Sequence, residues 1–285
     1  MAETTFEKLA AGAEIDVALG AALIARDAYP TLDVHALVQR FDDLAGPLVS
    51  AGLEAMTAAH AAEAIGAHVY DALGFAGNEA DYYDPRNSFL NDVLERRLGI
   101  PISLALVYCE IARRAGVRAE GVGFPGHFLV RVFGRAEDEV LVDPFYRGRV
   151  VDGAGLAEIF ERVADQASVE KKYESRADAA RALAEMTVAA TPRSFLTRWL
   201  MNLRSIHLAR GDLSRALLVV DRIASLNPRD RGVLRDRGLL EMRLGAKAAA
   251  RDDLALALSL DPSGEHADEI RALLAQLDER PTASN

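Results

Sequence analysis

His127 and Asp143 are the two residues whose types and surroundings best suit chemistry. His127 immediately precedes one β-rich run, at residues 128–132, and Asp143 directly follows another, at 140–142; residues 134–138 between them supply turn residues and charge. This pattern predicts an antiparallel hairpin. Asp143 then lies beside His127, where its carboxylate can fix the imidazole tautomer and raise its basicity. The pair fits either a retained base with a ligand-binding role or a buried polar pair kept for packing.

Two residues with nucleophilic side chains, Ser103 and Cys109, fall on a helix predicted over 101–115. Ser103 is in the first turn, where a serine more often bonds to the backbone. Cys109 follows Pro101 by eight residues, about 12 Å along a helix. Its apolar neighbours favour a small buried hydrophobe. On this helix we expect Leu104, Val107, Cys109 and Ile111 to be buried and Arg113 and Arg114 to face solvent.

Asn87, Asn91 and Glu95 recur every fourth residue and could share one helix face, toward the same site or toward solvent. No metal or other cofactor is expected. The single cysteine excludes a multi-cysteine zinc site. Five histidines also lack ligand spacing with one another: His60, His68, His127, His207 and His266.

The elements that must position these residues follow from hydrophobic spacing, caps and breakers. Between two helices near residues 54–73 and 87–99 lies a loop with Phe75, Tyr82 and Tyr83. We predict helices at 6–26, 33–44, about 54–73, 87–99 and 101–115, and strands at 118–122, 128–132, 140–142 and 149–151. The expected fold is therefore α+β, with helices covering one face of a small antiparallel sheet.

Three regions are predicted: a helical N-terminal region at 1–84, a core at 85–170 and a helical region at 171–285. The charged stretch at 170–176 is the candidate linker. A shift of 34 residues superposes Gly211 on Gly245, Ala216 on Ala250 and Pro228 on Pro262. This is the tetratricopeptide period, in which a small alanine lets two helices approach and a proline ends the second.

The two predicted repeats, at about 197–230 and 231–264, precede a capping helix near 265–277. Both depart from the usual pattern, since Arg204 stands where a small residue is usual and Arg237 where a leucine is usual. A generic helical bundle is the alternative. Arg235, Asp236 and Arg237 are adjacent charges on a helix, so at least one must face inward. We expect them at the junction of the repeats with the core, with Asp236 paired to an arginine.

Composition limits the partners and the compartment. The formal net charge of −10 disfavours nucleic acid. The chain has no window of about 18 uncharged apolar residues, so no membrane span is expected, and its acidic start does not resemble a signal peptide. A single cysteine fits a reducing compartment, and a cytoplasmic location is expected. The oligomeric state is left open.

The segment from Gly99 through Ser103 to Gly116 resembles the nucleophile helix of papain-type and transglutaminase-like folds. That family commonly has Gly-x-Cys, an alanine four residues after the cysteine, and a glycine that ends the helix. Here Pro101 stands in the cysteine position and Ala105 in the alanine position. By the same resemblance, His127 and Asp143 match the family's histidine and aspartate. The frame is present without its nucleophile.

A wider set of motifs resembles the bacterial SirB-type family, which joins a transglutaminase-like core to tetratricopeptide repeats. The matching segments are Gly74-Phe75, Gly77-Asn78, Asn87-Ser88, Gly99-Ile100-Pro101-Ile102, Phe124-Pro125-Gly126-His127 and Arg235-Asp236-Arg237-Gly238. The resemblance implies the same two-part architecture.

Two functions are therefore considered. The first is a non-catalytic binding or scaffold protein that recognises a protein or peptide through the degenerate core and the repeat surface. The second is a hydrolase or acyltransferase on amide or ester bonds, using Ser103 with His127 and Asp143. The missing cysteine favours the first, and the separation of Ser103 from His127 discriminates between them. Candidate ligand-binding residues are Asn87, Asn91, Glu95, His127 and Asp143.

Overall fold

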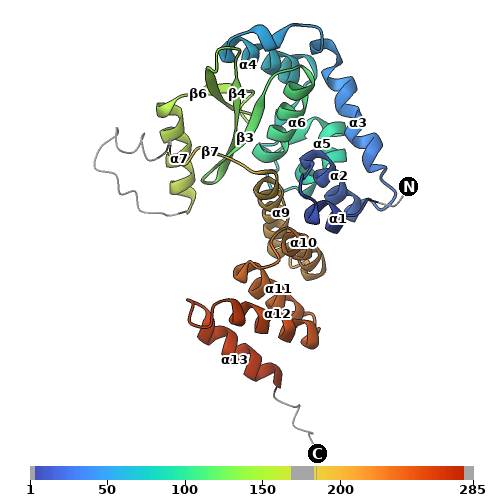
Figure 1. Cartoon of the computed structure of the whole chain (residues 1–285), viewed down its shortest axis with the longest axis vertical. Coiled ribbons are helices and arrows are strands. Elements are labelled where there is room, and N and C mark those ends of the chain that lie inside the picture. The colour runs from blue at the N-terminus through green and yellow to red at the C-terminus, as the bar shows by residue number, and fades with distance from the viewer. Residues whose placement is uncertain (1–3, 168–182, 184, 279–285) are drawn as a thin grey trace, which may run out of the picture. The chain divides into compact units, whose positions relative to one another are not determined.

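The chain forms two compact units in the computed structural model, which describes residues 4–167, 183 and 185–278 (Figure 1). The core unit comprises residues 15–199, and the repeat unit combines residues 1–14 with 200–285. The division thus falls after Trp199 and not near 170, because the start of the next long helix packs in the core. The predicted linker at 170–176 lies outside the described residues.

Three helices of the core unit begin at side-chain caps. The carboxylates of Asp16 and Asp33 and the hydroxyl of Thr57 accept backbone N–H groups at the starts of α2, α3 and α4. The helices are α2 (Val17–Ala28), α3 (Val34–Ala45), α4 (Ala58–Gly66), α5 (Leu90–Arg96), α6 (Pro101–Arg114) and α7 (Gly153–Ala167). A π-type turn (Ala67–Ala72) extends α4 toward Gly74.

The helix predicted over 6–26 is two helices. α1 (Phe6–Ala11) ends at Gly12, whose backbone is extended, and α2 starts afresh at the Asp16 cap. α1 belongs to the repeat unit, where it packs against α10 (Leu213–Leu226). The prediction that residues 1–84 all pack on the core is therefore wrong for its first segment.

The main sheet has the antiparallel order β6-β5-β4-β3-β7. Its strands are β3 (Ala119–Phe124), β4 (His127–Phe133), β5 (Glu139–Asp143), β6 (Arg149–Val151) and β7 (Val188–Ala189). The four predicted strands are confirmed; β7 has only two residues and was missed. In Figure 1, α6 lies along β3 and β4 while α7 lies on the other side of the sheet, where Leu129 packs with Leu156 and Ile159. Helices therefore cover both faces and not one.

The predicted helix at 101–115 is confirmed, with Leu104, Val107 and Ile111 buried. Two details differ. Cys109 is only partly buried. Arg114 is largely covered, because its guanidinium lies over the Phe41 ring and pairs with Asp42 and Glu110, whereas Arg113 is exposed as expected.

The repeat unit contains antiparallel helix pairs, as the period of 34 predicts. Gly211 and Gly245 take positive φ angles of 70° and 83° at the inter-helix turns. At Gly238 a Cβ would lie 2.8 Å from Leu254, so this glycine permits close helix packing. The helices are α9 (Pro192–Ala209), α10, α11 (Arg231–Arg243), α12 (Lys247–Leu260) and α13 (Ala267–Asp278). None of the described helices combines the length and apolarity that a membrane crossing requires.

The adjacent charges on α11 hold the repeat helices together. Asp236 pairs with Arg204 of α9, as expected for an arginine partner. Arg235 reaches Glu269 of α13, and Arg237 pairs with Asp253 of α12. All these partners belong to the repeat unit, so the ion pairs of this segment do not place it at a junction with the core.

Candidate functional site

The N-terminus of α6 carries Pro101, the residue that the resemblance aligns with the family's cysteine. Pro101 is the first helical residue, a place where its missing N–H is tolerated. Ser103 is fully buried, and its hydroxyl oxygen accepts the N–H of Ile100 at 2.9 Å and donates to the Ile100 carbonyl at 3.1 Å. The Ser103 hydroxyl is therefore used to close the first turn of the helix.

His127 and Asp143 form the predicted pair. Their Nε2 and Oδ2 atoms are 2.9 Å apart, and Asp143 is fully buried. Asp143 Oδ1 accepts the backbone N–H groups of Phe145 at 3.0 Å and Tyr146 at 3.3 Å. A carboxylate only accepts, so Nε2 of His127 donates to it and Nδ1 is left as the other ring nitrogen. Within the described residues, Nδ1 makes no hydrogen bond.

A cleft of about 560 Å³ brings the His127 ring to the start of α6. It is lined by Glu79, Tyr82, Tyr83, Pro101, Gly126, His127, Phe145, Tyr146, Ile159 and Arg162. His127 and Pro101 thus share one cavity, as the papain-type arrangement requires. Ser103, Cys109, Asn91 and Glu95 are not among the lining residues. The thiol of Cys109 has its pKa raised by burial and by the nearby Glu110 and Glu120, which does not favour a nucleophile.

Aromatic rings form one wall of this cleft. Tyr82 makes edge contacts with Tyr83 and with Phe145, at ring-centre distances of 5.3 and 5.9 Å. Tyr146 contacts Phe145 at 5.2 Å and stacks near His127 at 6.5 Å. The wall is therefore continuous from the loop before α5 to the imidazole.

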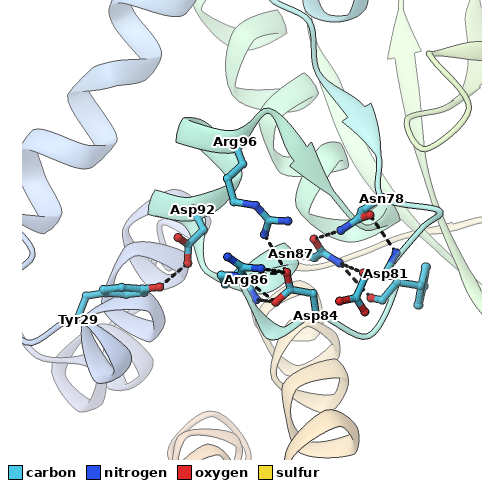
Figure 2. Close-up of polar contacts among 9 residues, drawn as sticks. Tyr29, Asn78, Asp81, Asp84, Arg86, Asn87, Asp92 and Arg96 are labelled. Carbon is cyan, nitrogen blue, oxygen red and sulfur yellow. Dashed lines mark hydrogen bonds and ion pairs between the residues drawn. The ribbon is translucent and has the colours of Figure 1, made fainter.

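The buried Asn87 holds the loop that carries the tyrosines (Figure 2). Its Oδ1 accepts from Asn78 Nδ2 at 2.9 Å, and its Nδ2 donates to the carbonyls of Asp81 at 2.8 Å and Tyr82 at 3.1 Å. The Asn78 side chain also accepts the N–H of Asp81. Asn87, predicted as a ligand contact, thus supports the cleft wall from behind.

Asp84 is a second buried anchor of the same loop, and Figure 2 shows two arginines converging on it. Arg86 and Arg96 pair with its Oδ2 at 2.9 and 3.2 Å. Burial alone would raise the pKa of Asp84, but hydrogen bonds from Arg86 and the charge of Arg96 outweigh it and lower that pKa. Tyr29 likewise donates to Asp92 at 2.7 Å.

The predicted face of Asn87, Asn91 and Glu95 does not form. Phe89 is extended, with φ −99° and ψ 117°, so α5 begins only at Leu90 and Asn87 lies in the preceding 3₁₀ turn (Pro85–Ser88). Glu95 is exposed. Asn91 is partly buried and its Oδ1 finds no hydrogen-bond partner in the described part of the chain.

Two supporting residues on α9 were missed from the sequence. Trp199 is fully buried and donates from Nε1 to the Ser88 carbonyl at 2.8 Å, close to the tyrosine loop. Arg198 donates to the carbonyls of Phe124 at 2.9 Å and His127 at 3.2 Å, the two ends of the turn that carries His127. The only signal in the sequence was the single tryptophan of the chain. The residues whose carbonyls Arg198 and Trp199 bond to lie more than 70 positions earlier in the chain.

Close backbone packing accounts for the glycines of two sequence motifs, Gly77-Asn78 and Gly99-Ile100. The short parallel strands β1 (Ala76–Gly77) and β2 (Leu98–Gly99) pair here. A Cβ on Gly77 would lie 2.7 Å from the ring of Phe145, a lining residue, and one on Gly99 would lie 2.6 Å from Ser103 Oγ. Both glycines allow backbone to approach the site closely.

Comparison with known proteins agrees with this architecture. The profile of the Transglutaminase-like superfamily matches residues 33–201, and a Tetratricopeptide repeat profile matches residues 203–275. A UPF0162 protein of Xylella fastidiosa (strain 9a5c) is 42% identical over 262 residues, which cover 90% of this chain and 88% of the relative. The chain belongs to the UPF0162 family. The SirB-type resemblance seen in the sequence motifs is thereby confirmed.

Other relatives share smaller parts. UPF0162 protein PA3419 of Pseudomonas aeruginosa is 33% identical over 192 residues, 67% of this chain and 65% of that protein. Outside the UPF0162 family, F-box only protein 21 of Homo sapiens is 46% identical over 88 residues, 28% of this chain and 14% of that protein. Among the described residues, no group of three or more His, Cys, Asp or Glu side chains is arranged to hold a metal ion.

Proposed function

We propose that this UPF0162 protein is a non-catalytic binding protein whose core cleft accepts a peptide segment. The observation that carries the proposal is Pro101, which lines the cleft together with His127. Proline offers no nucleophilic atom and no backbone N–H, so both a nucleophile and a potential oxyanion donor are missing at this point. No serine, threonine or cysteine occurs among the described residues that line the cleft.

The form of the cleft supports binding. Its volume of about 560 Å³ lies in the range of ligand sites, and aromatic side chains form much of its wall. The loop and turn around it are held by the buried residues Asn87, Asp84 and Trp199. Such fixed walls limit the entropy that a ligand must overcome on binding.

The repeat unit supports a protein or peptide partner. Tetratricopeptide repeats combined with a transglutaminase-like core suggest a protein-interaction scaffold, and repeat arrays of this kind present extended binding surfaces. The net charge of −10 opposes nucleic acid as the partner. The single cysteine supports a bacterial cytoplasmic setting, where thiols stay reduced.

The hydrolase alternative gains no support from the geometry. Ser103 is buried, bonds to both backbone groups of Ile100 and does not line the cleft. Among the described lining residues, the His127–Asp143 pair accordingly has no serine or threonine hydroxyl to activate.

Selection of random peptides displayed on phage against the full-length protein tests the proposal. Selected peptides should bind wild type and should lose at least about tenfold in affinity with His127→Ala, because this removes the ring at the cleft. The same change should cost only about 1–3 kcal/mol of stability, from the unpaired Asp143. His35→Ala, at an exposed histidine of α3, is the matched control and should change neither quantity.

Two results would contradict a non-catalytic binding role. One is cleavage or modification of the bound peptides, detected by mass spectrometry after incubation with wild type. The other is labelling by a serine-directed acylating probe that disappears in Ser103→Ala. Gross unfolding of His127→Ala, with no binding defect in its folded fraction, would make the residue part of the core only.

A further inference from the structure

Arg162 of α7 brings a positive charge to the cleft, and no carboxylate among the described residues forms an ion pair with it. Its Nη1 donates to the Tyr146 hydroxyl at 2.9 Å, and its guanidinium carbon lies 5.0 Å from the centre of that ring. A guanidinium has five N–H donors, and the described residues accept a hydrogen bond from Arg162 only at the Tyr146 hydroxyl. The stacking and the hydrogen bond hold its planar group in place.

Arg198 adds a second charge behind the His127 turn. Its side chain is partly covered and bonds to two carbonyl oxygens, and no acid in the described ranges forms an ion pair with it. Burial lowers the pKa of Arg198, although the nearby Tyr82 acts in the opposite direction. A partly buried charge without a counterion is energetically unfavourable unless hydrogen bonds or a bound anion stabilise it.

Further groups of the cleft favour an anion. Pro101 marks the positive end of the 14-residue helix α6. Tyr82, Tyr83 and Tyr146 all line the cavity and carry hydroxyl groups. Glu79 carries the opposing charge and is the one carboxylate among the described lining residues. Its side chain is exposed, so solvent screens its charge more than that of the partly buried Arg162.

We propose that the cleft recognises a carboxylate group of its peptide ligand, with Arg162 donating to that group and the tyrosine wall packing against the neighbouring apolar part. A planar guanidinium matches the two oxygens of a carboxylate. The inference rests on the binding function proposed above. The carboxylate is either a peptide C-terminus or an Asp or Glu side chain, since both present the same group.

Matched hexapeptides distinguish these sources. Random-sequence hexapeptides are synthesised in three sets: a free C-terminus without internal acids, an amidated C-terminus with one glutamate, and an amidated C-terminus with glutamine instead. Binding of full-length protein to each set is measured by fluorescence anisotropy. We expect one acidic set to bind at least tenfold more tightly than the neutral set, and that set identifies the source.

Two variants check the role of charge, one removing a positive charge from the cleft and the other a negative charge. Arg162→Gln should remove the preference for acidic peptides, whereas Glu79→Gln should increase their affinity about two- to fivefold. Equal binding of acidic and neutral sets, or a preference that survives Arg162→Gln, overturns the carboxylate inference and leaves the binding function standing. Failure of all three sets to bind contradicts both.

Discussion

The core unit and the repeat unit each differ from the residue pattern that the resemblance leads us to expect. Only in the repeat unit do neighbouring side chains compensate, because the unusual arginines form ion pairs there. In the repeats, Arg204 and Arg237 replace small or apolar residues, and each meets an acid, Asp236 and Asp253 respectively. In the core, the resemblance aligns Pro101 with the family's cysteine, and the described residues of the cleft include no serine, threonine or cysteine. A charge placed among packed helices must be paired for the fold to survive. Under the function proposed here, Pro101 changes the chemistry of the cleft without a cost to the fold, because proline suits the first turn of a helix.

Polar side chains that are buried or partly covered also serve different ends in the two units. In the core, Asn87 and Asp84 bond to the loop that carries the cleft tyrosines. In the repeats, Asp221, Arg237, Glu241 and Asp253 lie among α10, α11 and α12 and interact with one another. The first set shapes a cavity, whereas the second replaces apolar packing. Variants in the second set should therefore act on stability and not on the cleft.

The largest effect is expected for Asp253→Asn. This change removes the charge of the main partner of Arg237 and leaves its partly covered guanidinium only the more distant Asp221, at 3.4 Å, which should cost about 3 kcal/mol of unfolding free energy. Asp252→Asn, at the exposed neighbouring position, is the control and should stay within about 0.5 kcal/mol. Urea denaturation of the full chain, followed by circular dichroism, measures both. Equal stability of the two variants would mean that the ion pair does not compensate for Arg237.

A smaller, pH-dependent effect is expected at Glu241. Burial, then the charge of Asp253, raises the pKa of this carboxyl to about 7 despite the opposing effect of Arg237. In the unfolded chain it titrates near 4.5. The folded state thus holds a proton that the unfolded state has lost, and the stability from this group is lost as pH rises from about 4.5 to 7.

Glu241→Gln removes that titration. The variant should be more stable than wild type by about 1–3 kcal/mol above pH 7. This advantage should shrink steadily as pH falls toward 4.5. Denaturation midpoints at pH 5, 6, 7 and 8 give the difference. A constant difference across this range would show that Glu241 keeps an ordinary pKa.

The smallest effect is expected for Ser103→Ala. Loss of the hydroxyl removes the bonds to Ile100 and should cost about 1 kcal/mol. Affinity for the selected peptides should stay unchanged, because Ser103 does not line the cleft. A large loss of binding or of any peptide turnover, with the stability intact, would bring the hydrolase interpretation back.

Local signals predicted much of this fold. Pro101 and Gly116 bound α6, since proline suits the first turn and a glycine at φ 76° ends the helix. The turn residues at 134–138 predicted the β4–β5 hairpin. The repeat period predicted the helix pairs of the C-terminal region. In each case the determining residues lie within a few positions of the element, or recur at a fixed distance.

Features that depend on distant contacts were not predicted. Nothing near α1 shows that it packs on α10, about 200 residues later. Arg114 looked exposed, but its partner Asp42 is 72 residues away. The helical face proposed for Asn87, Asn91 and Glu95 failed because Phe89 breaks the helix, a position with no glycine or proline to mark it.

For the site, the resemblance gave His127, Asp143 and the absent nucleophile, whereas the supporting residues emerged only in three dimensions. Arg198 and Trp199 act through backbone carbonyls of segments far along the chain. Carbonyl acceptors carry no signature in the sequence, because every residue has one. Arg162 was missed for a related reason, since its position at the cleft depends on how α7 packs on the sheet.

The most direct test of the account places a thiol at the empty nucleophile position. In a Cys109→Ser background, Pro101→Cys is treated with iodoacetamide at pH 6, and alkylation is followed by mass spectrometry. If the His127–Asp143 pair still serves that position, the imidazole should favour the thiolate, and alkylation should fall at least about tenfold when His127→Ala is added. The same slow rate with and without His127 would contradict the claim that the His127–Asp143 pair still serves the position that Pro101 occupies.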